Sequence, residues 1–273
     1  MAKEKMSENT YDAFSSEYDL FVNWSNRLKV EMPFLTKQLD LLKNGKNEPL
    51  SVLDAACGTG MHAIALTKTG YRTAGADFSP QMIRQAHGNA NAAGVSVDFQ
   101  NASFGQFANT FQNRLEFPFD AILCLGNSLP HLLSLEKIGN ALSDFAACLQ
   151  PGGLLILQNR NFDAVLANQE RWFPPQAFSQ KSQDWLFLRF YDFLPDGLIA
   201  FHILRLHRID GKEWKQEISS MQLFPLRQDD IQKALINTGF DHIQFFGELA
   251  ETPFDPRESG NLVLTARKRL AVN

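Results

Sequence analysis

The sequence predicts an α/β fold: an open, mostly parallel, doubly wound sheet with an antiparallel β insert after its fifth strand. Three observations support this prediction. Short apolar runs alternate with helix-compatible stretches from residue 51 to residue 158. A glycine-bracketed turn, Cys57–Gly60, follows the first apolar run. After Asn161 three strand-like runs follow one another with short turns, which is typical of antiparallel hairpins.

The first strand begins at Ser51, and its apolar run ends at Asp54. A buried strand that enters a helix through a glycine turn is typical of a ligand-binding loop. Gly58 and Gly60 lack Cβ atoms, so the backbone N–H groups of the turn can approach a ligand closely. Asp54 adds a carboxylate to that surface. We therefore expect a small polar, nucleotide-like ligand at this turn.

Periodicity predicts two helices ahead of this strand, over residues 7–22 and 27–43. The first has aromatic side chains at helical spacing and is either a packing helix or a lid over the ligand. Ser79 and Pro80 are typical of the first positions of a later helix. The remaining strands are expected over 71–76, 95–99, 120–125, 154–158, 185–193, 198–209, 214–224, 242–248 and 262–267, and the remaining helices over 61–69, 80–91, 135–149 and 228–238. The last two strands have no helix pattern between them and are expected to be antiparallel.

The composition limits the possible partners and compartments. A net charge of −4 argues against nucleic acid, because binding to phosphates needs a basic surface. The three cysteines have no metal-ligand spacing, so we expect no metal site and a reducing cytoplasm. No apolar run is typical of a signal peptide or a membrane span. We expect one domain, with N-terminal helices in 1–47, a ligand-binding core in 48–160, a substrate or lid insert in 161–226 and a C-terminal part in 227–273.

Two cofactor classes fit the glycine turn. Gly58–Ala63 satisfies the G-x-G-x-x-G/A dinucleotide pattern, and Asp77 lies near the expected ribose-binding position, so a dinucleotide-dependent oxidoreductase is one alternative. Asp54, four residues before the first glycine, stands where a dinucleotide-binding strand usually has an apolar residue. Together with the Pro-Gly-Gly turn in Leu149–Leu155, it favours S-adenosylmethionine (SAM).

Taken in order, Asp54–Gly60, Gly75–Met82 and Pro151–Gly153 resemble the class I SAM-dependent methyltransferases over roughly residues 50–160. The resemblance implies a Rossmann-like, seven-stranded sheet whose last strand is antiparallel, and SAM as the cofactor. It implies that the turn cradles the methionine part of SAM and that Asp77 binds both ribose hydroxyls. Asp77 has an alternative role as an acid at a helix N-terminus.

Two further segments, Leu123–Leu132 and Leu157–Asp163, are similar to segments of the glycine N-methyltransferase and glycine/sarcosine methyltransferase group. This similarity implies that Asn127 lies in the active site and that Arg160 pairs with the carboxylate of an amino-acid acceptor. The two resemblances together imply cofactor contacts at Tyr18, Arg27, Asp54, Ala56, Gly58, Gly60, Asp77, Phe78, Met82, Asn101, Ala102, Ser103 and Leu125. Met82 has an alternative role as helix core.

Arg160 is also a candidate on physical grounds. It follows an apolar run at the carboxyl end of a strand, which is the ligand-binding edge of such sheets, and a guanidinium there can hold a carboxylate with two hydrogen bonds. The alternative is an ion pair with a protein carboxylate such as Asp163 or Asp77. Asn127 ends the neighbouring strand and is otherwise a turn residue.

His131 is either a base or a structural residue, and we expect the acceptor wall to come from Trp172, Phe173 or Tyr191. The predicted reaction is transfer of the SAM methyl group to the amine of a small carboxylate-bearing acceptor such as glycine or sarcosine, with no dedicated base assigned. The alternatives are methylation of another small molecule, at a hydroxyl or a natural-product amine, a dinucleotide-dependent oxidoreductase, and a SAM-binding protein without turnover.

Overall fold

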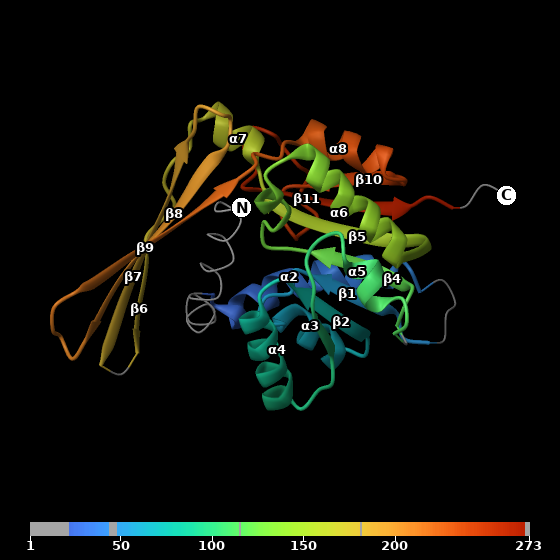
Figure 1. Ribbon diagram of the computed structural model, residues 1–273, viewed down its shortest axis with the longest axis horizontal. Helices are drawn as coiled ribbons and strands as arrows, with labels where there is room; N and C mark the ends of the chain where they lie inside the picture. The colour runs from blue at the N-terminus through green and yellow to red at the C-terminus, as the bar shows by residue number, and fades with distance from the viewer. Residues whose placement is uncertain (1–21, 44–47, 115, 181, 271–273) are drawn as a thin grey trace.

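The computed structural model describes residues 22–43, 48–114, 116–180 and 182–270. Residues 7–21 of the first expected helix, and with them Tyr18, lie outside the described residues. A seven-stranded sheet forms the body (Figure 1). Its strands are β1 (Ser51–Ala55), β2 (Arg72–Asp77), β3 (Asp98–Asn101), β4 (Phe119–Cys124), β5 (Leu149–Arg160), β10 (Phe240–Phe246) and β11 (Asn261–Lys268).

The strand order is β10-β11-β5-β4-β1-β2-β3. Strands β1 to β5 pair with one another in parallel, whereas β11 is antiparallel to both β5 and β10. This topology confirms the predicted fold class, including the antiparallel last strand. The order reverses between β1 and β4, and ligands of open α/β sheets bind at the carboxyl ends of the strands beside such a reversal.

Helices cover both faces of this sheet (Figure 1). Alternate residues of β1 explain the two layers, because Val52 packs in the cluster with α2 and Leu53 packs in the cluster with α6 and α8. The helices are α2 (Trp24–Asp40), α3 (Met61–Lys68), α4 (Pro80–Ala93), α5 (Phe107–Phe111), α6 (Leu135–Cys148), α7 (Phe162–Ala167) and α8 (Gln228–Asn237), with a short 3₁₀ helix η1 (Leu129–Leu132). No helix in the described ranges is long and apolar enough to cross a membrane.

Capping fixes both ends of α4. The Ser79 hydroxyl accepts a hydrogen bond from the Met82 amide at 3.1 Å, as its N-cap position predicts. At the other end Gly94 is left-handed, and the Val95 amide returns to the Ala90 carbonyl at 3.1 Å. The expected start of the third strand at residue 95 is therefore wrong. Residue 95 still belongs to the helix cap, and β3 begins at Asp98.

The expected start of the fifth strand at residue 154 is also wrong. Strand β5 begins at Leu149, directly after α6, and contains the Pro-Gly-Gly segment that we expected to precede it. Its pairing with β4 shifts register between Phe119 and Ala121, and Gly152 adopts a φ of +75°. The segment is an irregularity inside the strand, where glycine supplies the left-handed backbone.

The insert forms a second, antiparallel sheet, and its order is β6-β7-β8-β9. Its strands are β6 (Gln176–Gln180), β7 (Gln183–Phe193), β8 (Ile199–Ile209) and β9 (Lys215–Leu223). One half packs on α7 through Phe162, Tyr191 and Leu223, and the other half projects away from the body (Figure 1). Strand β6 was not expected, because its largely exposed and polar sequence carries no apolar pattern.

Replacing Gly60 with alanine is expected to destabilise the protein. Gly60 has a φ of +78°, and an added Cβ atom would lie 2.5 Å from Cζ of Phe99. The free energy of unfolding should fall by about 2–4 kcal/mol, from the left-handed backbone and the overpacking together. Urea denaturation measures this change.

The matched control for that variant is Gly88→Ala in the exposed interior of α4. No atom lies within 4 Å of an added Cβ atom at Gly88. This variant should become more stable by about 0.5–1 kcal/mol, because alanine is the better helix former. Equal effects of the two substitutions would contradict the close packing at Gly60.

Candidate functional site

The glycine turn bends sharply between β1 and α3. Three of its residues have a left-handed backbone, with φ values of +61° at Ala56, +54° at Gly58 and +78° at Gly60. Ala56 is not glycine, so it carries local strain of the kind that occurs at functional sites. The ring of Phe99 lies where a Cβ atom of Gly60 would be. The turn therefore has a packed floor and a smooth backbone surface, which suits close approach by a ligand.

Asp77, at the carboxyl end of β2, is bound to this turn. Its Oδ2 atom accepts a hydrogen bond from the Gly58 amide at 2.9 Å, and its Oδ1 atom accepts one from the Ser79 amide at 2.9 Å. Only 6% of the surface of Asp77 is exposed. Asp77 thus ties the glycine turn to the start of α4, and its buried carboxylate lies beside the turn at which we expect a ligand.

Asp54 ends β1 as a buried carboxylate. Only 3% of its surface is exposed, and Oδ2 has no hydrogen-bond partner among the described residues. Burial raises the pKa of Asp54 from 3.8 to about 6, although the charge of His62 and the Ala63 amide oppose this change. An orphaned acceptor beside a ligand-binding turn is what a cationic or N–H-bearing ligand would satisfy.

Arg27, on helix α2, is held by Glu31, and Glu31 is held in turn by His62. Sequence analysis missed both Glu31 and His62. The Nε atom of Arg27 donates to both oxygens of Glu31, at 3.0 and 3.1 Å, and Oε2 of Glu31 lies 2.6 Å from Nε2 of the buried His62. Burial raises the pKa of Glu31, but the hydrogen bond from His62 and the charge of Arg27 outweigh it and lower the pKa overall. A Cβ atom at Gly126 would lie 3.8 Å from Nη2 of Arg27, so the guanidinium faces the loop after β4.

The spacing of Arg27 and Glu31 was the available signal for this ion pair, because residues i and i+4 share one face of a helix. His62 gave no such signal. It belongs to α3, on the far side of the glycine turn, and only the packing of α2 against α3 brings its ring to Glu31.

The other side of Asp77 is lined by further residues that we expected to contact the cofactor. The side-chain amide of Asn101 donates to the carbonyls of Asp77 and Phe78, at 2.9 Å each. Ala102 is buried and its amide donates to the Asp77 carbonyl at 3.0 Å, whereas the side chain of Met82 is 3% exposed. The Asn101 nitrogen is therefore committed to the backbone, and its Oδ1 atom is the group that can accept from a ligand.

Ser103 and Leu125 flank the site from two different loops. Ser103 is exposed, and its amide donates to the side chain of Gln106 at 3.1 Å. Leu125 is buried directly after β4, and its carbonyl accepts from the Ser128 hydroxyl at 2.9 Å. Apart from Arg27 on α2 and Met82 on α4, the structure thus places the described cofactor candidates at or just beyond the carboxyl ends of β1, β2, β3 and β4.

Asn127 and Arg160 lie together at the carboxyl edges of β4 and β5. Oδ1 of Asn127 accepts a hydrogen bond from the Arg160 amide at 2.9 Å, and the Asn127 amide donates to the Gln158 carbonyl at 3.1 Å. Asn127 has a φ of +67°, a left-handed conformation that asparagine tolerates better than most residues. The side-chain amide nitrogen of Asn127 has no hydrogen-bond partner among the described residues.

The Arg160 side chain is paired with a protein carboxylate, as the alternative interpretation had it, but the partner is neither of the two examples named there. Its Nη2 atom donates to both carboxylate oxygens of Glu170, at 2.9 Å each. Asp163 instead pairs with Arg227 at 2.8 Å, and the Asp77 oxygens bind backbone amides. The prediction of an ion pair with Asp163 or Asp77 is therefore wrong. The first turn of α7 places Asp163 against Arg227 at the start of α8, whereas Glu170, in the loop after α7, reaches Arg160.

An aromatic ring adjoins this ion pair. The guanidinium of Arg160 lies 5.4 Å from the centroid of the Phe173 ring, and that of Arg189 lies 4.9 Å from the same centroid. Tyr191 packs against Phe173 and is 3% exposed, and burial raises the pKa of its hydroxyl. Two of the three expected wall residues, Phe173 and Tyr191, thus lie beside Arg160, and sequence analysis missed Arg189.

The other expected residues of this region are placed differently. Trp172 is 61% exposed and lies 5.0 Å from the ring of Phe190 on β7, so it faces outward from the insert. Burial lowers the pKa of His131, on η1, to about 4. An imidazole with this pKa is a poor base for an ammonium group, which favours a structural role for His131.

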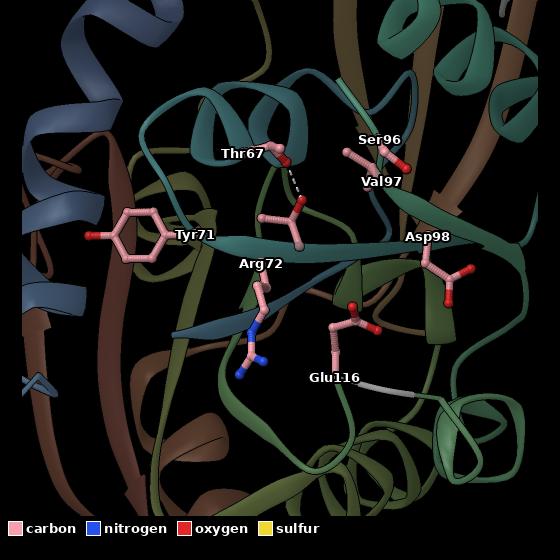
Figure 2. A pocket seen from close by; sticks show the side chains of 8 residues that line it. Thr67, Tyr71, Arg72, Ser96, Val97, Asp98 and Glu116 are labelled. Atoms are coloured by element: carbon pink, nitrogen blue, oxygen red, sulfur yellow. Dashed lines mark hydrogen bonds between the residues drawn. The ribbon is translucent and has the colours of Figure 1, made fainter. Parts of the chain in front are cut away.

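A polar groove of about 480 Å³ lies at the opposite edge of the sheet. Figure 2 shows Arg72 and Glu116 extending beside one another below the first residues of β2 and β3. These strands present their amino ends here, so this groove is separate from the site built by Asp54, Asp77 and Arg160. No group of three His, Cys, Asp or Glu side chains within the described ranges could hold a metal ion.

Comparison with known proteins agrees with this geometry. Residues 52–153 match a methyltransferase-domain family. A glycine/sarcosine N-methyltransferase of Aphanothece halophytica is 31% identical over 255 residues, covering 90% of this chain and 85% of the relative. A glycine/sarcosine N-methyltransferase of Parasynechococcus marenigrum (strain WH8102) is 30% identical, covering 86% of this chain and 77% of the relative.

The fold is shared with solved structures as well. A SAM-dependent methyltransferase from Clostridium acetobutylicum ATCC 824 has a TM-score of 0.72 and 15% identity, covering 94% of this chain and 96% of that one. The glycine turn, the buried Asp54, whose Oδ2 atom has no partner within the described ranges, and the position of the Asp77 carboxylate beside that turn fit SAM as the cofactor. The chain therefore belongs to the glycine/sarcosine N-methyltransferase family and is a SAM-dependent methyltransferase.

Proposed function

We propose that this methyltransferase transfers the methyl group of SAM to the amine of a small carboxylate-bearing acceptor, glycine or sarcosine. The single observation that carries the proposal is the joint position of Asn127 and Arg160, which a 2.9 Å hydrogen bond ties together at the carboxyl edge of the sheet. The similarity to two glycine/sarcosine N-methyltransferases supports the same acceptor class. The proposal extends that class to this chain.

The cofactor is proposed to bind along the turn after β1. When bound, SAM supplies a methyl group that its sulfonium already makes reactive toward an amine. Asp77, held beside this turn, accepts hydrogen bonds from the ribose hydroxyls. Asp54 and Arg27 face the methionine part, where a buried carboxylate suits an ammonium group and a guanidinium suits a carboxylate. Oδ1 of Asn101 accepts from the adenine amino group.

The acceptor is proposed to bind between the loop after β4 and the end of β5. Arg160 holds its carboxylate, and the side chain of Asn127 orients its amine toward the reacting methyl group. Phe173 and Tyr191 limit access of water to this space, which strengthens the ion pair. With a sulfonium donor, the contribution of these residues is alignment and exclusion of water, and the amine reacts after losing its proton to solvent.

A second candidate acceptor is an amine that lacks a carboxylate. The observation in its favour is the Arg160–Glu170 ion pair, which already neutralises the guanidinium. Such an acceptor would not need Arg160, so the two candidates differ in their dependence on this residue.

Incubation with methyl-labelled SAM and a panel of acceptors tests the proposal. We expect label transfer to glycine or sarcosine, and weaker transfer to glycinamide, which keeps the amine but lacks the carboxylate. Transfer to glycinamide at an equal or higher kcat/KM than to glycine would reject the carboxylate-bearing acceptor. Binding of SAM without transfer to any member of the panel would reject glycine and sarcosine.

Arg160→Ala is expected to raise the KM for glycine by about 10-fold to 100-fold and to weaken SAM binding little. The loss corresponds to one charge-assisted hydrogen-bonded pair of about 1.5–3 kcal/mol. Steady-state kinetics with labelled SAM measures this change. The control is Arg208→Ala, which removes an arginine from the Asp184 ion pair on the projecting half of the second sheet. An unchanged KM in Arg160→Ala would contradict the clamp.

Asp54→Asn is expected to stabilise the cofactor-free protein while weakening SAM binding. Because the folded-state pKa of Asp54 is raised to about 6, ionising this group costs folding free energy at neutral pH. The shift from 3.8 corresponds to about 3 kcal/mol at most. Urea denaturation should show the full gain near pH 7, a smaller gain as the pH falls from about 6, and none once the pH lies well below 3.8.

The affinity for SAM provides the second readout of this variant. Titration calorimetry should show SAM binding weakened about tenfold at pH 7, since the neutral amide cannot pair with the SAM ammonium group. Wild-type affinity should fall below pH 6 as Asp54 gains a proton, and the variant should lack this pH dependence. Unchanged affinity in Asp54→Asn would contradict its assignment to the cofactor.

A further inference from the structure

Glu170 is bound to Arg160, the residue that we propose as the ligand of the acceptor carboxylate. Both of its carboxylate oxygens lie 2.9 Å from Nη2 of Arg160, so a protein carboxylate already sits where the acceptor carboxylate is proposed to bind. The backbone of Glu170 is fixed, because its amide donates to the Val165 carbonyl at the end of α7 at 2.9 Å. Only the side chain has to move for Glu170 to leave Arg160.

The exposure of the pair allows this movement. The side chain of Arg160 is 24% exposed and that of Glu170 is 42% exposed, so the carboxylate can return to water when it leaves. Ion pairs with such exposure add little net free energy, equivalent to at most about a fivefold change in an equilibrium constant. Glu170 is therefore a weak occupant that a second carboxylate can replace.

The remaining donors and charges favour exchange over sharing. Nε of Arg160 is buried and has no hydrogen-bond partner among the described residues. Arg189 places a second guanidinium against the same Phe173 ring. Two carboxylates on the one Nη2 atom of Arg160 would repel each other, so an incoming carboxylate takes the place of Glu170 and does not join it.

We propose that Glu170 is an internal carboxylate ligand of Arg160 that the acceptor carboxylate displaces, which makes Glu170 a specificity-determining residue of the acceptor site. This inference rests on the proposed function, because it takes Arg160 as the acceptor clamp. When no acceptor is present, Glu170 keeps the guanidinium of Arg160 oriented and balances its positive charge. It also sets the acceptor KM, because every carboxylate-bearing acceptor has to compete with it.

Competition of this kind has a distinctive consequence. Acceptors with a carboxylate compete with Glu170 for Arg160. Acceptors without a carboxylate do not bind Arg160, so their KM does not depend on Glu170. Removing the charge of Glu170 should therefore change the KM for one class of acceptor alone. A residue that only supports the fold of the loop after α7 would change both classes together.

Glu170→Gln tests the inference with kinetics on two acceptors, glycine and glycinamide, at saturating labelled SAM. Glutamine keeps the size of the side chain and removes its charge. We expect the KM for glycine to fall about twofold to fivefold, the kcat to stay within a factor of two, and the KM for glycinamide to stay unchanged. The matched control is Glu213→Gln, the same charge change at an exposed position between β8 and β9, which should alter neither KM.

Two results would overturn the inference. A higher KM for glycine in Glu170→Gln would mean that Glu170 orients Arg160 for binding and does not compete. An equal change for glycine and glycinamide, or no change, would mean that the pair is structural. Failure of the proposed function differs from both, because then Arg160→Ala would leave the KM for glycine unchanged, or the wild-type enzyme would transfer no methyl group to glycine or sarcosine.

Discussion

The hydrogen bond from the Gly58 amide to the Asp77 carboxylate is the interaction on which the cofactor side of the molecule depends. It joins the turn after β1 to the end of β2, and the same carboxylate accepts from the Ser79 amide ahead of α4. One buried side chain thus fixes a glycine turn, a strand end and a helix start. Because those three elements form the cofactor surface, the site is built before any ligand arrives.

The acceptor side depends on a comparable bond between neighbouring strand ends. Oδ1 of Asn127 holds the Arg160 amide, and β11 pairs with the far edge of β5, with Asn261 opposite Arg160. The backbone of Arg160 is therefore fixed from both sides. Its guanidinium is held more weakly, by the half-exposed Glu170 and the ring of Phe173. A fixed backbone with an exchangeable side-chain partner suits a residue that has to release and bind carboxylates.

Polar and charged side chains reach this site from elements that lie far apart in the chain. Helix α2 contributes Arg27 and Glu31, and helix α3 contributes His62, which closes the ion-pair cluster at 2.6 Å from Glu31. The burial of Asp54 beside that cluster raises its pKa and leaves Oδ2 without a partner among the described residues. Buried charge that is left partly uncompensated costs folding free energy, and ligand binding can recover that cost.

The sequence by itself determined the sheet, the glycine turn and the edge at which Asp54, Asp77 and Arg160 meet, because period, caps and parallel strand ends are local signals. It missed β6, because an exposed strand carries no apolar period. It also displaced the starts of β3 and β5, because a helix cap precedes β3 and a Pro-Gly-Gly irregularity interrupts the apolar run of β5. Only the tertiary structure decided which charges pair. Arg160 binds Glu170 and not Asp163 because loop geometry after α7, and not sequence distance, sets which carboxylate reaches the guanidinium.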